Sequence, residues 1–142
     1  MNKLLLVIPE NSYKSNDFVL TAERLDIDFL VITDSDQVSS QFGDTVISQN
    51  FNEKISDETL TKLKKITHVL PVDHSALKFA GYLVDLLHAK GNKLFAIEQS
   101  MNKFNSRNTF NSISKLKAKN MVIKSLNDIE AFVEKNGTSV LK

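Results

Sequence analysis

The sequence predicts an α/β protein built on a small, doubly wound parallel sheet. Residues 4–8 and 29–32 are continuous apolar runs, as expected of strands whose two faces are both covered by helices. A third run at 68–72 is separated from them by stretches with apolar residues at helical spacing. This alternation of strands and helices predicts a three-layer fold with helices on both faces of the sheet.

The first half of the chain supplies three of the expected strands. Residues 4–8 form the first strand, which Pro9 stops, and residues 27–33 form the second. We expect residues 37–44 to be a polar loop and residues 45–47 to be a short edge strand. Between the first two strands, Ser15 or Asn16 is expected to cap a helix with these inward residues: Phe18, Val19, Ala22 and Leu25.

Two further helices flank the strand at 68–72. Ser56 is a typical cap before an acidic first turn, and its helix places Leu60, Leu63 and Ile66 inward. Asp73 is expected to cap a long apolar helix that ends near Leu87. Gly91 is expected to be the left-handed residue at which that helix stops.

The pattern changes past residue 93. Residues 94–99 fit a short helix or a turn of strand, and Asn102 can cap a helix. Residues 120–123 and 139–141 are expected strands, and the helix between them opens at Ser125 and ends at Gly137. We therefore predict a sheet domain over residues 1–93 and an incomplete α+β unit over residues 94–142.

Composition limits the classes of protein. With 42% hydrophobic and 25% charged residues and no cysteine, the chain is typical of a globular protein without disulfides or thiolate metal sites. The run at 4–8 is too short for a signal peptide or a membrane span, so we expect a cytoplasmic protein that does not associate with membranes. The charge is uneven: residues 1–100 hold ten Lys/Arg and fourteen Asp/Glu, whereas residues 101–142 hold eight and three.

Several familiar sites are excluded by the residues present. The loop at 9–13 has no glycine, so it lacks the close backbone approach that a dinucleotide pyrophosphate needs, and no P-loop exists. Glu10 stands alone after the first strand, which argues against a phosphoacceptor site. His68, His74 and His88 are not at ligand spacing, so we predict no metal site in this chain.

Two loops are candidates for a small-molecule pocket. Residues 10–14 follow the first strand, and Asp73 and His74 follow a later one, so both loops are expected at the carboxyl edge of the sheet. The candidate substrate-binding residues are Glu10, Ser12, Tyr13, Asp73 and His74. Asp73 also has the simpler interpretation of a helix cap, and the two roles are compatible.

The ordered set of local strings resembles the N-terminal part of an ATP-grasp ligase, from the Rossmann-like pre-ATP-grasp domain into the start of the ATP-grasp domain. The resemblance is nearest to the carboxylate–amine ligases related to carbamoyl-phosphate synthase. The strings that carry it are residues 12–14 with Asp17 and Phe18, residues 22–25, 31–34, 68–73, Gly91 with Asn92, Asn102 and Lys103 with Arg107, and residues 137–142.

The resemblance implies ATP-dependent ligation. A substrate carboxylate attacks the γ-phosphate to form an acyl phosphate, and an amine then displaces phosphate. Lys103 and Lys142 match the family's two phosphate-contacting lysines, and the ligands of Mg²⁺ lie in a part of the family pattern that this chain does not contain. Where the family usually has glycine, this chain has Asp26 before the second strand and His88 after Leu87.

We therefore expect the N-terminal portion of an ATP-dependent carboxylate–amine ligase, which shapes the substrate site and one wall of the ATP site and has no catalytic residue or activity of its own. The alternative is a truncated homologue that acts as a binding or interaction module. A nucleic-acid-binding role for the basic tail is disfavoured, because few aromatic residues interleave with its lysines. Residues 120–142 are expected to pack on the sheet domain, to swap between copies or to form a homodimer.

Overall fold

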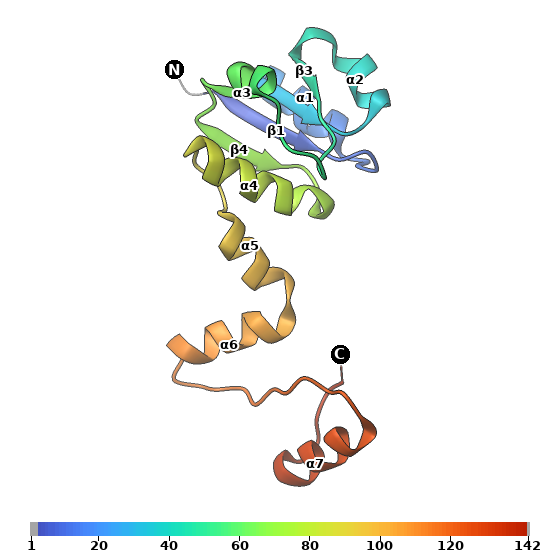
Figure 1. Ribbon diagram of the computed structural model, residues 1–142, viewed down its shortest axis with the longest axis vertical. Coiled ribbons are helices and arrows are strands. Elements are labelled where there is room, and N and C mark those ends of the chain that lie inside the picture. Colours follow the sequence, from blue (N-terminus) through green and yellow to red (C-terminus); the bar gives the residue numbers. More distant parts are fainter. Residues whose placement is uncertain (1–2, 142) are drawn as a thin grey trace. The chain divides into compact units, whose positions relative to one another are not determined.

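The computed structural model describes residues 3–141 and divides the chain into two compact units, Met1–Ile97 and Glu98–Lys142. Figure 1 shows the sheet and its helices in the first unit and helices joined by extended chain in the second. We call them the sheet unit and the C-terminal unit and describe each by itself.

The sheet unit contains four parallel strands in the order β3-β2-β1-β4. The strands are β1 (Leu4–Ile8), β2 (Phe29–Thr33), β3 (Val46–Ser48) and β4 (His68–Pro71). Leu6 of β1 is in register with Val31 of β2 on one side and with Leu70 of β4 on the other. The predicted three-layer parallel α/β fold is confirmed, and the short strand β3 lies at an edge as expected.

Helices cover both faces of this sheet (Figure 1). On one face, Leu5 and Val7 pack with residues of α3 (Asp57–Leu63) and α4 (Leu77–Leu87), including the fully buried Leu63 and Leu83. On the other face, Leu6 and Ile8 pack with residues of α1 (Ser15–Arg24) and α2 (Asp36–Phe42). Alternate residues of β1 thus enter opposite cores, which explains the continuous apolar run in the sequence.

Three local predictions for the sheet unit were wrong. Residues 37–44 are mostly helical, because the Ser35 hydroxyl accepts the Val38 N–H and starts α2, whose Val38 is buried. Helix α1 has no side-chain cap, and its Ser15 hydroxyl instead donates to the Ser12 carbonyl oxygen. Leu25 is 60% exposed, because it lies beyond the last turn of α1.

Helix α4 ends at a left-handed residue, but that residue is His88 (φ 51°) and not Gly91. Gly91 has a different role: a Cβ atom there would lie 2.9 Å from the Val69 carbonyl oxygen. The neighbouring Lys90 pairs with β4. Its N–H donates to the Thr67 carbonyl oxygen, and its own carbonyl oxygen accepts the Val69 N–H. Asp26 (φ 53°) is the second non-glycine residue with positive φ among the described residues.

The first turn of α5 (Leu94–Met101) is fixed on α4. The Asp85 carboxylate accepts the Leu94 N–H at 3.1 Å, and Ile97 is buried. Gly81 permits this contact, because a Cβ there would lie 2.7 Å from Ile97 Cδ1 and 2.8 Å from Leu94 Cα. Residues 94–99, for which helix or strand was expected, are therefore helical.

The C-terminal unit contains α6 (Lys103–Ile113) and α7 (Leu126–Asn136). Both predicted helix starts are confirmed: the Asn102 side chain accepts the Asn105 N–H, and Ser125 and Asp128 form a reciprocal capping box. Gly137 follows α7 with φ 77°. Neither expected strand, 120–123 or 139–141, forms within the described residues, because a strand requires a hydrogen-bonded neighbour and none is provided there.

Candidate functional site

The sheet order places two loops at a site typical of ligand binding. The chain passes from β1 to β2 on one side of β1, whereas β4 lies on the other side, so the direction of winding reverses between β1 and β4. In parallel sheets, ligands bind at the carboxyl edge at such a reversal. The loops that follow β1 and β4 both leave the sheet at this edge, and they carry Glu10, Ser12, Tyr13, Asp73 and His74.

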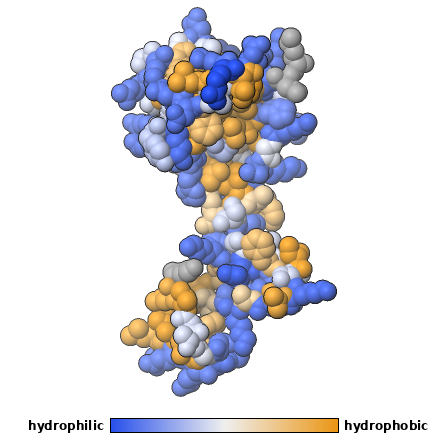
Figure 2. All heavy atoms as spheres, turned by 180° about the vertical axis from the view of Figure 1, so that it is seen from behind, coloured by the Kyte–Doolittle hydropathy of each residue, from blue (hydrophilic) through white to orange (hydrophobic). Residues whose placement is uncertain are grey.

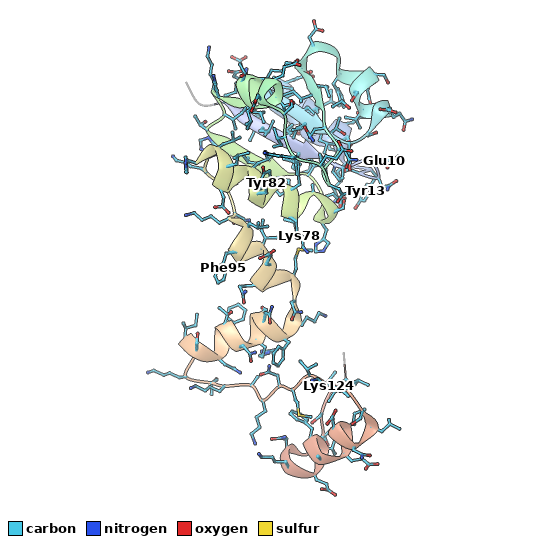
Figure 3. The ribbon with its side chains drawn as sticks, viewed as in Figure 1. Glu10, Tyr13, Lys78, Tyr82, Phe95 and Lys124 are labelled. Atoms are coloured by element: carbon cyan, nitrogen blue, oxygen red, sulfur yellow. The ribbon has the colours of Figure 1, made fainter. Side chains whose placement is uncertain are left out.

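The backbone of Glu10 is held by a neighbouring strand end. Its N–H donates to Asp34 Oδ1 at 2.7 Å, and Asp34 directly follows β2. The Glu10 side chain is exposed at the sheet edge (Figure 3). Asp34 thus fixes the start of the loop and leaves the Glu10 carboxylate available to a ligand.

The rest of this loop is tied to the start of α1. The Ser12 N–H donates to the Pro9 oxygen at 3.1 Å, and the Ser12 hydroxyl accepts the Lys14 N–H at 3.3 Å. Tyr13 is 83% exposed, and Lys14 Nζ lies 5.1 Å from the centre of its ring. Figure 3 shows Tyr13 beside Glu10 on the same loop. The ring is thus presented to solvent on a loop whose backbone is anchored.

Asp73 is a helix cap as the sequence indicated, but it does not cap α4, which has no side-chain cap. Its Oδ1 accepts the His74 N–H at 2.6 Å at the start of the short helix η2 (His74–Ala76), which leads into α4. Asp73 is half-buried and His74 is exposed. Within the described residues, no hydrogen bond or ion pair joins this loop to the one after β1. The edge therefore offers two separate carboxylates, an aromatic ring and an imidazole to a bound molecule.

The predicted phosphate contacts belong to the C-terminal unit. Lys103 is the first residue of α6 and is exposed, and Arg107 lies one turn later. The first turn of α6 contains no acidic residue, so the helix dipole and both cations favour a bound anion. Lys142, the other predicted contact, lies outside the residues that the structure describes.

Two carboxylates outside this set of residues, Glu58 and Asp128, have shifted pKa values. A hydrogen bond and the charge of Lys62 lower the pKa of Glu58. Hydrogen bonds with the Lys124 N–H, the Ser125 side chain and the Ser125 N–H lower the pKa of Asp128. Across residues 3–141, no three His, Cys, Asp or Glu side chains gather into a group able to hold a metal ion. No helix within the same range is long and apolar enough to cross a membrane.

Asp34 is the residue of this site that the sequence reasoning missed. It directly follows a buried strand, and Glu10 and Asp73 lie two residues past the ends of β1 and β4, so their similar positions were the available signal. Its contact with Glu10 depends on β1 and β2 being neighbours in the sheet. The sequence alone does not show which strands are neighbours.

Comparison with known proteins shows the fold. No protein-family model matches the sequence, and no curated protein matches it by sequence. Two similar solved structures are an L-amino acid ligase from Bacillus licheniformis (TM-score 0.58, 17% identity) and an ATP complex of carboxyaminoimidazole ribonucleotide synthase from Aspergillus clavatus (TM-score 0.57, 20% identity). The match covers 94% of this chain in both cases. The chain shares their fold.

The chain spans less than half the length of either enzyme, 42% of the ligase and 35% of the synthase. The matched part of this chain is too long to lie within the sheet unit alone, so it includes residues of the C-terminal unit. The likeness therefore extends from one unit into the other.

Proposed function

We propose that this chain is the N-terminal portion of an ATP-grasp carboxylate–amine ligase of the cytoplasm. In this role the sheet unit contributes substrate-binding loops and the C-terminal unit contributes one wall of the ATP site. The observation that carries the proposal is the fold likeness to a ligase and to an ATP-bound synthase over 94% of the chain.

A second observation comes from the backbone. The resemblance places family glycines at the positions of Asp26 and His88, and these are the two non-glycine residues with positive φ in the described chain. Glycine adopts that conformation without the steric cost that a Cβ atom brings. The match between family glycines and left-handed backbone supports the alignment on which the assignment of Lys103 rests.

The chemistry that ATP would supply is activation of a carboxylate as an acyl phosphate. Lys103 and Arg107 would neutralise phosphate oxygens at the start of α6, because both are cations near a helix N-terminus that lacks acids. At the sheet edge, Glu10 and Asp73 would accept hydrogen bonds from an amine substrate. We assign no Mg²⁺ ligand in this chain, so it would bind the nucleotide without catalysing the ligation.

The first test is ATP binding by the purified chain, measured by calorimetry. We expect Lys103→Ala to weaken binding by about ten- to a hundredfold, since a charge-assisted contact to phosphate contributes about 1.5–3 kcal/mol. Lys124→Ala is the matched control, because Lys124 precedes α7 and lies far along the chain from the start of α6 (Figure 3). If the two substitutions weakened ATP binding equally, Lys103 would not be a contact of the ATP site.

The second test is ATP turnover. We expect phosphate release at the rate of the buffer blank when the chain is mixed with Mg²⁺, ATP, amino acids and amines. ATP turnover that copurifies with the chain and is lost in a Lys103 variant would show that the chain is a complete catalyst, contrary to the proposal.

A further inference from the structure

The C-terminal unit has helices but no buried core. No residue among 98–141 is buried, although the unit contains two helices of eleven residues each. Figure 2 shows apolar side chains at the surface of this unit. An exposed apolar surface of this kind marks a site of interaction with another polypeptide or ligand.

The apolar side chains line an open groove of about 1510 Å³ within the unit. Helix α6 contributes Phe104 and Phe110, α7 contributes Phe132 and Val133, and the extended chain between them contributes residues 121–123. Phe110 is 59% exposed, Val122 51% and Val133 42%. Because these side chains are about half exposed on both helices and on the connecting segment, another polypeptide segment can pack against them.

The extended segment also has free backbone groups. No N–H or C=O group of residues 121–123 has a hydrogen-bond partner within the described chain, whereas Ala118 just before them is bonded twice to Asn111. Extended backbone with free donors and acceptors next to an apolar surface is a template for an added β-strand. This second feature points to a polypeptide and not to a small apolar molecule.

The charge of the groove indicates what that polypeptide carries. Four basic residues line it, Lys103, Arg107, Lys117 and Lys119, and none of its described lining residues is acidic. A second copy of this unit would bring the same four cations against them, which disfavours self-pairing. Most apolar lining residues are aliphatic, so the groove has few faces on which bases could stack, and a nucleic acid is also disfavoured.

We propose that residues 121–123 accept an acidic, strand-forming segment of another polypeptide, whose apolar side chains fill the groove between α6 and α7. Backbone hydrogen bonds to residues 121–123 would supply affinity, and carboxylates on the added strand would pair with Lys117 and Lys119. This proposal goes beyond the ligase assignment. Lys103 and Arg107, the phosphate contacts of that assignment, line the same groove, but the contacts proposed here are made by residues 121–123, Lys117 and Lys119.

The test uses the full chain and synthetic peptides of about nine residues, a usual strand length. An alternating valine–glutamate peptide is the probe, and fluorescence anisotropy measures its binding. The same peptide N-methylated along one edge cannot form the backbone ladder, and an alternating valine–lysine peptide reverses the charge. A single-stranded DNA oligonucleotide is the fourth probe. Hydrogen exchange with and without the probe locates the contact.

We expect saturable binding of the valine–glutamate peptide and slower exchange of residues 121–123. N-methylation and the double substitution Lys117→Glu and Lys119→Glu should each weaken binding at least tenfold. The matched control is Lys54→Glu with Lys93→Glu, which changes the net charge equally at exposed sites of the sheet unit.

Four results would overturn the proposal. These are no binding of the probe at about 1 mM, equal binding of the N-methylated or valine–lysine peptide, tighter binding of the oligonucleotide, and a dimer of the free chain in which residues 121–123 already resist exchange. The N-methylated peptide keeps the test valid even if the charge-reversed variant fails to fold. None of these measurements includes ATP, so the result is separate from that of the ligase assignment.

Discussion

Helix α3 of the sheet unit and helix α7 of the C-terminal unit both begin at a serine cap, but they differ in what they cover. In the sheet unit, Ser56 caps α3 and the helix then buries Leu63 against the sheet. In the C-terminal unit, Ser125 starts α7 with a complete capping box, yet no residue of α7 is buried. Capping depends on neighbours in sequence, whereas burial depends on a partner layer, and the second unit lacks that layer within the described residues.

The largest effect should come from removing a buried side chain in the sheet unit. We expect Leu83→Ala to lower the free energy of unfolding by about 2–5 kcal/mol, because it leaves a cavity between α4 and the sheet. Leu126→Ala makes the same chemical change at a residue that is 77% exposed and should cost less than about 0.5 kcal/mol. Urea unfolding measures both, and equal losses would contradict the contrast between the units.

A smaller effect is expected where α5 packs on α4. Gly81→Ala would place a Cβ 2.8 Å from the Leu94 backbone, which cannot yield as a side chain can. We expect a loss of about 1–3 kcal/mol from overpacking. Lys78→Ala is the matched control, because Lys78 is exposed on the same helix (Figure 3). A neutral or stabilising Gly81→Ala would show that this contact does not fix α5.

The third prediction has the opposite sign. His88→Gly and Asp26→Gly should each stabilise the sheet unit by about 1 kcal/mol, because glycine removes the strain of a left-handed residue. Leu86→Gly, within α4, is the control and should be destabilising by about 1 kcal/mol. Thermal unfolding checks all three, and destabilisation at both positive-φ sites would contradict the assigned backbone.

The sequence was sufficient for the parts of the fold that depend on local patterns or on strongly buried strands. The strands at 4–8 and 68–72 and the caps Ser56, Asn102 and Ser125 were predicted for the right physical reasons. The strands expected at 120–123 and 139–141 did not form. Their apolar residues satisfy strand propensity, but a strand also requires pairing, which no local pattern guarantees.

The candidate site was predictable only in part. Glu10 and Asp73 could be placed at one edge because parallel strands end together. Asp73 is a cap as expected, although it caps η2 and not the long helix α4. The Asp34 contact was missed, because it depends on which strands are neighbours. Whether Glu10, Ser12, Tyr13, His74 and Lys103 bind substrate or ATP stays a prediction until the binding experiments are done.

The smallest effect concerns the capping box of α7. Hydrogen bonds with the Lys124 N–H, the Ser125 side chain and the Ser125 N–H lower the pKa of Asp128, so its contribution to α7 is present above its ordinary pKa of 3.8. As pH falls through that value and below, the carboxylate is protonated and the contribution is lost. We expect the Ser125 amide to exchange faster at pH 3 than its intrinsic pH dependence predicts. Asp128→Asn should abolish this excess, and an unchanged excess in that variant would exclude the carboxylate as its cause.

Native-state hydrogen exchange along the whole chain tests the contrast between the units most directly. We predict that amides of β1 and β2 exchange only through global unfolding of the sheet unit, whereas the amides of residues 121–123 exchange at nearly the rate of an unfolded peptide. Protection of residues 121–123 equal to that of β1 in the isolated chain would contradict the account, because it would show that the C-terminal unit is already complete.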